Sequence, residues 1–156
     1  MNIVIAADPF ATALKDAIKR HLEQAEHSVI DVGTKSAQEV TFFNASRRAC
    51  AVIQEGRAER GILFCGSGMG VAIVANKHVG ITAACVESVF AARLCRAINN
   101  ANVLCLGAMI WGEWMAKEAV DVFLKTEHTE GLDNLKEFLI KACEEVNAID
   151  ENTRKR

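Results

Sequence analysis

The chain has 156 residues, 51% hydrophobic and 24% charged, with a net charge of −2. This balance suits one soluble globular domain, residues 1–150, with a charged tail over 151–156, and it excludes a disordered chain. The near-neutral charge argues against nucleic-acid binding, and no apolar run reaches the roughly 20 residues that cross a membrane. The N-terminus lacks the charged region and length of a signal peptide, so we expect a cytoplasmic protein.

Short apolar runs alternate with stretches of helical periodicity along the chain. In the first helical stretch, apolar side chains recur at helical spacing, from Phe10 to Leu22. Runs that are apolar throughout indicate parallel strands buried on both faces, so the alternation predicts an α/β fold with a three-layer, doubly wound, five-stranded parallel sheet of Rossmann-like type. In chain order we expect strand 2–7, helix 10–27, strand 28–33, helix 42–56, strand 60–65, helix 68–78, strand 80–86, helix 88–99, strand 102–107, helix 111–126 and helix 132–149.

Polar and reactive residues follow several of these strands. Asp8 follows the first strand and Cys65 ends the third. Open parallel sheets bind ligands beyond the carboxyl ends of their strands, so we expect Asp8 and Cys65 to face one crevice. Asn99 lies before the fifth strand, away from that rim unless its loop folds back.

A glycine-rich turn, Gly66-Ser67-Gly68-Met69-Gly70, joins Cys65 to the next helix. Glycines let a backbone approach a ligand closely, and amides at a helix N-terminus can face an anion or a developing oxyanion. The same helix end would make the Cys65 thiol a better base or nucleophile. The pattern matches neither the dinucleotide fingerprint nor the P-loop, so a tight turn with a buried cysteine remains an alternative.

The six cysteines form no CxxC pair, and no histidine pair has metal-ligand spacing, so we expect no metal site. Disulfides are not expected in a cytoplasmic protein, and the cysteines other than Cys65 are interpreted as small core residues. Arg96, on the helix before the asparagines, is a candidate contact for an anionic substrate or part of a solvated helix face.

Several stretches, in order, resemble a family of sugar-phosphate isomerases that includes ribose-5-phosphate isomerase B and the galactose-6-phosphate isomerase subunits. The resemblance covers roughly residues 1–126, and its most specific block is CGSG followed by ANK. The matching stretches are IVIAAD, LKDAIKRHL, HSVIDVGT, GILFCGSGMGVAIVANKHVGITAA and RAINNANVLCLGAMIWGEWMAKEAVDVFL.

The resemblance implies an enzyme that interconverts aldose and ketose sugar phosphates through an enediolate, without a cofactor. By position, Cys65 would be the base and Ser67 would replace a usual threonine, while the amides of residues 66–70 would stabilise the enediolate. Asp8 would hold sugar hydroxyls. Asn99 would contact the substrate across a subunit interface, which implies a homodimer or homotetramer with shared active sites.

The sequence departs from the family pattern at several positions. Pro9 stands in place of a histidine, and Ile98 replaces the histidine credited with opening the sugar ring. Phe42 stands where the family has a tyrosine. Two phosphate-binding arginines near the C-terminus correspond to Leu132 and Lys136, which leaves Lys136 as the cation at that place.

A ring-opening group is needed only for a cyclic substrate. A tetrose 4-phosphate cannot close a furanose, because the required oxygen carries the phosphate. We therefore expect poor activity on ribose 5-phosphate and better activity on an open-chain sugar such as a tetrose phosphate. A histidine-bearing partner subunit or a non-catalytic sugar-phosphate-binding subunit are the alternatives. A cysteine-nucleophile hydrolase ranks last, because no histidine ends another strand.

Overall fold

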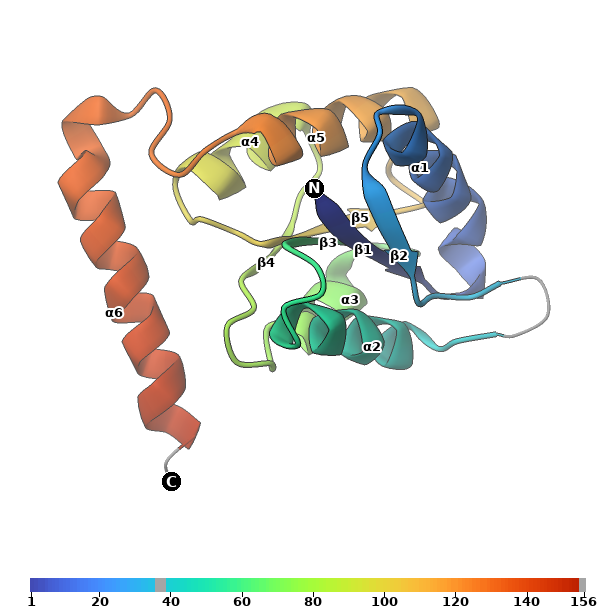
Figure 1. The fold of residues 1–156 in the computed structure, drawn as a ribbon, viewed down its shortest axis with the longest axis horizontal. Helices are drawn as coiled ribbons and strands as arrows, with labels where there is room; N and C mark the ends of the chain where they lie inside the picture. Colours follow the sequence, from blue (N-terminus) through green and yellow to red (C-terminus); the bar gives the residue numbers. More distant parts are fainter. Residues whose placement is uncertain (36–38, 155–156) are drawn as a thin grey trace.

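The computed structural model describes residues 1–35 and 39–154, and it confirms the doubly wound α/β fold (Figure 1). Five strands form one sheet in the order β2-β1-β3-β5-β4, and every neighbouring pair is parallel. The strands are β1 (Asn2–Ala7), β2 (Ser28–Asp31), β3 (Arg60–Cys65), β4 (Ala83–Cys85) and β5 (Val103–Gly107).

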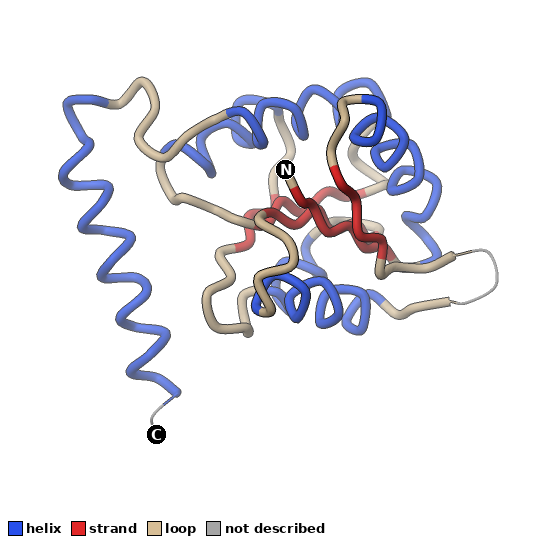
Figure 2. The backbone as a smooth tube through the Cα atoms, in the orientation of Figure 1, coloured by secondary structure: helices blue, strands red, loops and turns tan. Residues whose placement is uncertain are grey.

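Helices cover both faces of the sheet, which gives the three layers (Figures 1 and 2). One face carries α1, α4 and α5, and the other carries α2 and α3. The helices are α1 (Thr12–Gln24), α2 (Phe42–Gln54), α3 (Met69–Ala75), α4 (Val89–Ala97), α5 (Glu113–Lys125) and α6 (Lys136–Arg154), with 3-10 turns η1 (Pro9–Ala11) and η2 (Asp133–Leu135).

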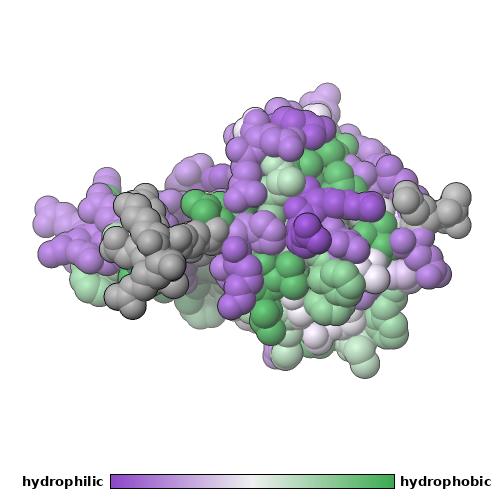
Figure 3. All heavy atoms as spheres, turned by 90° about the horizontal axis from the view of Figure 1, so that it is seen from below, coloured by the Kyte–Doolittle hydropathy of each residue, from purple (hydrophilic) through white to green (hydrophobic). Residues whose placement is uncertain are grey.

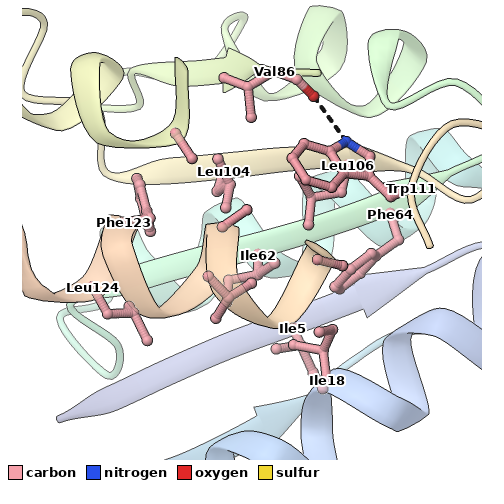
Figure 4. Close-up of a cluster of buried hydrophobic side chains, with 14 of the residues drawn as sticks. Ile5, Ile18, Ile62, Phe64, Val86, Leu104, Leu106, Trp111, Phe123 and Leu124 are labelled. Atoms are coloured by element: carbon pink, nitrogen blue, oxygen red, sulfur yellow. Dashed lines mark hydrogen bonds between the residues drawn. The ribbon is translucent and has the colours of Figure 1, made fainter. Parts of the chain in front are cut away.

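Two hydrophobic cores lie on either side of the central strands, because the side chains of each strand alternate between the two faces. Figure 4 shows the larger core, in which Ile5, Ile62 and Leu104 pack beneath α5. Trp111 enters this core, and its indole N–H donates a hydrogen bond of 2.9 Å to the Val86 carbonyl. Burial of the ring with its one polar group bonded fixes the loop between β5 and α5.

The strand order reverses between β1 and β3, since the chain moves outward to β2 and then returns to the far side of β1. A crevice for ligands forms at such a switch point, beyond the carboxyl ends of the strands. In the β1–β3 register Ala7 lies opposite Phe64, so Asp8 and Cys65 follow at the same level. Both edge strands are short, with four residues in β2 and three in β4.

The C-terminal helix differs from the expectation. It begins at Lys136 and continues through Arg154, so the charged stretch expected to form a frayed tail extends the helix. Residues 155–156 of that stretch lie outside the described residues. Helix α6 stands apart from the three layers, as Figures 1 and 2 show. Within the described ranges, no helix has the length and apolar character needed to span a membrane.

Candidate active site

Cys65 ends β3 at the switch point, with its side chain 5% exposed. The Gly68 N–H donates a hydrogen bond of 3.2 Å to the Cys65 sulfur. Gly68 has a φ of +79°, a left-handed conformation that favours glycine, and it directs this amide back toward the thiol. A thiolate accepts such a bond more strongly than a thiol does, so the turn is arranged to hold a sulfur base.

The glycine turn rests on the end of β5. A Cβ atom added to Gly107 would lie 2.5 Å from the Ser67 carbonyl carbon and 2.6 Å from its oxygen. A Cβ on Gly68 would lie 3.0 Å from the Gly107 nitrogen. Glycine at both positions therefore lets two backbone segments meet in direct contact, which fixes the height of the turn above the sheet.

The Ser67 hydroxyl oxygen accepts a hydrogen bond of 3.3 Å from the Met69 N–H. Met69 begins α3, and its side chain is 51% exposed. In the part of the chain that the structure describes, no acceptor is recorded for the amides of Gly66, Ser67 and Gly70. These three amides and the Ser67 hydroxyl are the groups of the turn that remain for a ligand.

Asp8 lies beside this turn. Its Oδ1 accepts a hydrogen bond of 3.1 Å from the Ala11 N–H and caps η1, which leaves the second carboxylate oxygen for a ligand. Adjacent strands lie about 4.8 Å apart, so the register places the Asp8 and Cys65 backbones close together. The expectation that these two residues share one crevice agrees with this placement.

Apolar side chains surround the glycine turn. Atoms of Phe10 and Met109 lie within 4 Å of where a Gly66 Cβ would stand, and the Phe42 ring lies 3.1 Å from the corresponding point on Gly70. Phe10 and Met109 are 64% and 73% exposed. Apolar side chains also reach the surface seen from below, among hydrophilic ones (Figure 3). An exposed apolar patch of this kind marks an interaction surface.

Cys85 is a site neighbour that the sequence interpretation missed, since it was assigned to the core. Its thiol is exposed and donates a long hydrogen bond of 3.8 Å to the Ser67 carbonyl. Protein atoms nevertheless shield the sulfur from part of the solvent. This desolvation raises the pKa of the Cys85 thiol, and the charge of Cys65 raises it further. Its position at the end of β4 was the available signal, because every strand of a parallel sheet ends at this edge.

Two other predicted site residues lie on the opposite side of the sheet from Cys65, where the strands begin. Asn99 is exposed on the turn before β5, and Lys136 is exposed at the start of α6. The five residues of β5 separate this edge from Cys65 by about 17 Å. A cavity of 290 Å³ lies beside Asn99, between this turn and α6. One chain therefore does not bring Asn99 or Lys136 to Cys65.

Arg96 does not have the expected surface position. Its side chain is 2% exposed, and its guanidinium donates to the carbonyls of Ala101 and Thr126 and to the Asn100 side chain, at 2.7, 3.3 and 2.9 Å. The sequence placed Arg96 on a helix face without revealing that α5 covers it. Because its side chain is buried and donates three hydrogen bonds to protein groups, Arg96 is not part of the substrate site proposed below.

Within the described ranges, no three His, Cys, Asp or Glu side chains gather in a way that could hold a metal ion. His128 lies 3.6 Å from the Cys143 sulfur, near the cavity beside Asn99. His21 lies 2.7 Å from an Asp121 oxygen, between α1 and α5. Neither histidine is placed beside Cys65 by these contacts.

Comparison with known proteins extends over nearly the whole chain. A profile of the family described as Ribose/Galactose Isomerase matches residues 3–147. The 4-deoxy-4-sulfo-D-erythrose isomerase of Clostridium sp. (strain MSTE9) is 42% identical over 154 residues, 97% of each chain. The D-erythrulose-4-phosphate isomerase of Pectobacterium atrosepticum is 36% identical over 132 residues, covering 84% of this chain and 87% of that relative.

A solved structure of Clostridium thermocellum ribose-5-phosphate isomerase B is similar over the entire fold. It superposes with a TM-score of 0.89 at 31% identity, covering 98% of this chain and 99% of that one. The match therefore includes α6 as well as the sheet and the glycine turn. The chain belongs to the Ribose/Galactose Isomerase family, and it is an enzyme of the aldose–ketose isomerase type.

Proposed function

We propose that the protein isomerises an open-chain, four-carbon sugar with an anionic group on C4, and that Cys65 is the base. The observation that carries this proposal is the Cys65 sulfur held by the Gly68 N–H at the switch point of the sheet, 3.2 Å away. A base beside unpartnered amides suits proton transfer next to a carbonyl, and it requires no cofactor.

The proposed reaction moves one carbon-bound proton. The Cys65 thiolate removes the proton from C2 of the aldose, and the electron pair forms an enediolate with its charge on O1. The amides of Gly66, Ser67 and Gly70 donate to that oxygen, and Asp8 holds the sugar hydroxyls. The thiol then returns a proton to C1, while the O2 proton passes to O1, so the ketose has the composition of the aldose.

The choice of a four-carbon substrate rests on Ile98 and on ring chemistry. An isoleucine cannot transfer the protons that open a sugar ring. The two relatives above are named for a 4-sulfo-4-deoxy tetrose and a tetrulose 4-phosphate, neither of which has the free 4-hydroxyl needed for a furanose. A terminal phosphate and a terminal sulfonate are both candidates, and Lys136 is the cation proposed to contact either one.

We also propose that a second copy of the chain completes the site, as a homodimer or homotetramer. Cys65 and Asn99 lie at opposite edges of one sheet, so a shared site needs Asn99 and Lys136 from a partner. Exposed apolar side chains on the segments that follow β1, β4 and β5 offer the contact surface: Phe10, Phe90, Met109, Ile110, Trp114 and Met115. Helix α6 adds exposed apolar side chains of its own: Phe138, Val146 and Ile149.

Two alternatives from the sequence stay open as outcomes of the test. A partner subunit with a histidine would restore activity on cyclic sugars, and a non-catalytic subunit would bind sugar phosphates without converting them. The retained thiol, its amide donor and Asp8 favour catalysis by this chain. The cytoplasmic location expected from the sequence stays a prediction.

The test follows deuterium from D₂O into the sugar by NMR. Erythrose 4-phosphate, 4-deoxy-4-sulfoerythrose and ribose 5-phosphate are compared as substrates. We expect exchange at C1 or C2 with the four-carbon sugars, and Cys65→Ala is expected to reduce it by about 10²–10⁴-fold. Cys50→Ala, in the buried face of α2, is the matched control with near-normal exchange. Exchange that survives Cys65→Ala, or no exchange with any sugar, would contradict the proposal.

A further inference from the structure

Arg96 has the largest side chain among the fully buried residues that the structure describes. It lies in the last turn of α4, and its guanidinium joins two backbone carbonyls and one side chain. Nη1 donates to the Asn100 Oδ1 at 2.9 Å and to the Ala101 carbonyl at 2.7 Å, while Nε donates to the Thr126 carbonyl at 3.3 Å. The guanidinium also lies over the Phe123 ring, 6.0 Å from its centroid.

This cation has no ion pair in the described part of the chain, where every salt bridge involves other residues. Burial lowers the pKa of Arg96, and the nearby positive charge of Arg60 lowers it further, while the negative charge of Glu127 opposes these effects without forming an ion pair. A buried charge that is bonded only to neutral acceptors is costly, and an apolar side chain of similar volume often fills such a place without loss of stability. Fold stability alone therefore gives a weak reason for an arginine here.

Two of the three acceptors of Arg96 lie in the turn that carries Asn99. Asn100 has a φ of +51°, a left-handed conformation that is uncommon for a residue other than glycine. The same guanidinium nitrogen bonds the Asn100 side chain and the Ala101 carbonyl, so it fixes both residues that follow Asn99. The third acceptor, Thr126, is the C-terminal cap of α5. The chain continues from Thr126 to Lys136 at the start of α6.

We propose that Arg96 is a positioning residue for the substrate contact made by Asn99. It sets the direction in which Asn99 leaves the turn, and its bond to Thr126 ties that turn to the segment that leads to Lys136. This inference rests on the proposed function, in which Asn99 and Lys136 act on the sugar held by a partner's Cys65. Arg96 itself does not touch the substrate.

A double-mutant cycle tests this role. Asn99→Ala and Arg96→Met are each expected to lower kcat/KM for the best four-carbon substrate by about tenfold or more, and the double variant is expected to be no worse than Asn99→Ala. Thermal midpoint and gel-filtration volume are measured for each protein. If Arg96 only stabilises the fold, the reductions of kcat/KM in the two single variants should multiply in the double variant, because destabilisation does not depend on Asn99.

A second variant, Asn100→Gly, tests the same contact if Arg96→Met folds poorly. Asn100→Gly removes the side chain that Arg96 bonds, yet glycine favours the positive φ at this position. We expect Asn100→Gly to fold normally and still to lower kcat/KM, again without further effect in the Asn99→Ala background. Normal kcat/KM in a folded Asn100→Gly protein would overturn the proposal.

Arg93→Met is the matched control on the same helix. The Arg93 guanidinium donates to the Glu130 carbonyl at 3.2 Å and makes no recorded contact with the Asn99 turn. Any effect of Arg93→Met is expected to multiply with that of Asn99→Ala. If the wild-type protein converts none of the sugars, the proposed function fails. If the wild-type protein is active and Asn99→Ala is normal, the substrate contact proposed for Asn99 fails, and the role of Arg96 fails with it. If Asn99→Ala is impaired and its effect multiplies with that of Arg96→Met, only the role of Arg96 fails.

Discussion

Ile98 lies directly before Asn99, at the position where the resemblance to sugar-phosphate isomerases implies a histidine. Its side chain lines the cavity between the turn before β5 and α6. An apolar group at this place removes proton transfer to the ring oxygen while leaving the thiol and the glycine turn in place. Under the proposed function, Ile98 is therefore expected to affect which sugars are used, and not whether an enediolate forms.

Ile98→His is expected to add activity on a cyclic sugar. The imidazole would supply the acid and base that ring opening requires, so kcat/KM for ribose 5-phosphate should rise by about tenfold or more. Activity on a four-carbon substrate should change little, since that substrate needs no ring opening. Steady-state assays with both sugars measure the ratio. An unchanged ratio would show that ring opening does not limit the reaction.

The cysteines divide by their surroundings. Cys50 and Cys95 are buried in the two cores, and burial raises the pKa of each thiol from an ordinary value of 9.0 to about 11. The unfolded chain exposes both thiols, so between pH 9 and 11 it has lost protons that the folded chain retains. The free energy of unfolding must fall as pH rises through this window.

The pH prediction is tested by thermal unfolding in reductant between pH 8 and 11. We expect the thermal midpoint to fall across the window, with a contribution on the order of 2 kcal/mol from each buried thiol. The double variant Cys50→Ala, Cys95→Ala removes both titrating groups and should show a shallower fall. Equal slopes for the two proteins would mean that other groups control alkaline unfolding.

At the scale of elements, the glycine turn depends on the strand beneath it. Gly107 ends β5 in direct contact with Ser67, with a contact of 2.5 Å expected for an added Cβ. That atom would meet backbone, which cannot move aside as a flexible side chain can. The end of β5 therefore sets the position of the amides that are proposed to face the substrate.

Gly107→Ala is expected to displace the turn. The clash should cost about 1–3 kcal/mol of stability and reduce kcat by more than this loss explains, because the amides would leave their positions. Gly112→Ala is the control, since a Cβ at Gly112 has nothing within 4 Å and its φ is ordinary. Chemical denaturation and steady-state kinetics measure both variants. A fully active Gly107→Ala protein would contradict this account.

The strands were easier to predict than the helices that follow them. The apolar runs 2–7 and 60–65 match β1 and β3 residue for residue, because buried parallel strands have few polar positions. The helix expected over 68–78 is shorter, since Gly68 takes a left-handed conformation before it and Asn76 ends it. The expected C-terminal helix was too short at its end, because residues 151–156 were interpreted as a charged tail. Helix α6 continues past residue 149, since no glycine or proline follows to end it.

The candidate site could be predicted only in part. The rule that ligands lie beyond strand ends placed Asp8 near Cys65, and the β1–β3 register agrees. Asn99 could be named but not placed, because its relation to Cys65 depends on a second chain. Arg96 was misplaced because helical periodicity shows which face a residue occupies, but not that α5 and the loop after it cover that face.

At the scale of the whole molecule, the chain carries Cys65 and Asn99 at opposite ends of the strands of one sheet, and the proposed function makes them two halves of a shared site. In a two-fold symmetric dimer each site would combine Cys65 of one copy with Asn99 of the other. Mixing two impaired variants distinguishes this arrangement from a site within one chain. Cys65→Ala is expected to be nearly inactive as a pure protein, and Asn99→Ala is expected to keep about a tenth of wild-type activity or less.

Mixed under conditions that exchange subunits, the two variants should regain about a quarter of wild-type activity, because half of the dimers are mixed and each has one intact site. Native mass spectrometry of the mixture, with one variant carrying a mass tag, provides the control for exchange. If the two variants exchange subunits and regain no activity, Cys65 and Asn99 do not share a site between copies.

The short edge strands have a consequence for how copies of this chain meet. Only four residues of β2 and three of β4 present unpaired backbone at the sides of the sheet. Such brief edges offer little template for another chain to add a strand, which also limits aggregation. In the proposed dimer, the chains are therefore expected to associate through helix and loop side chains, so that the sheet keeps the five strands of the single chain.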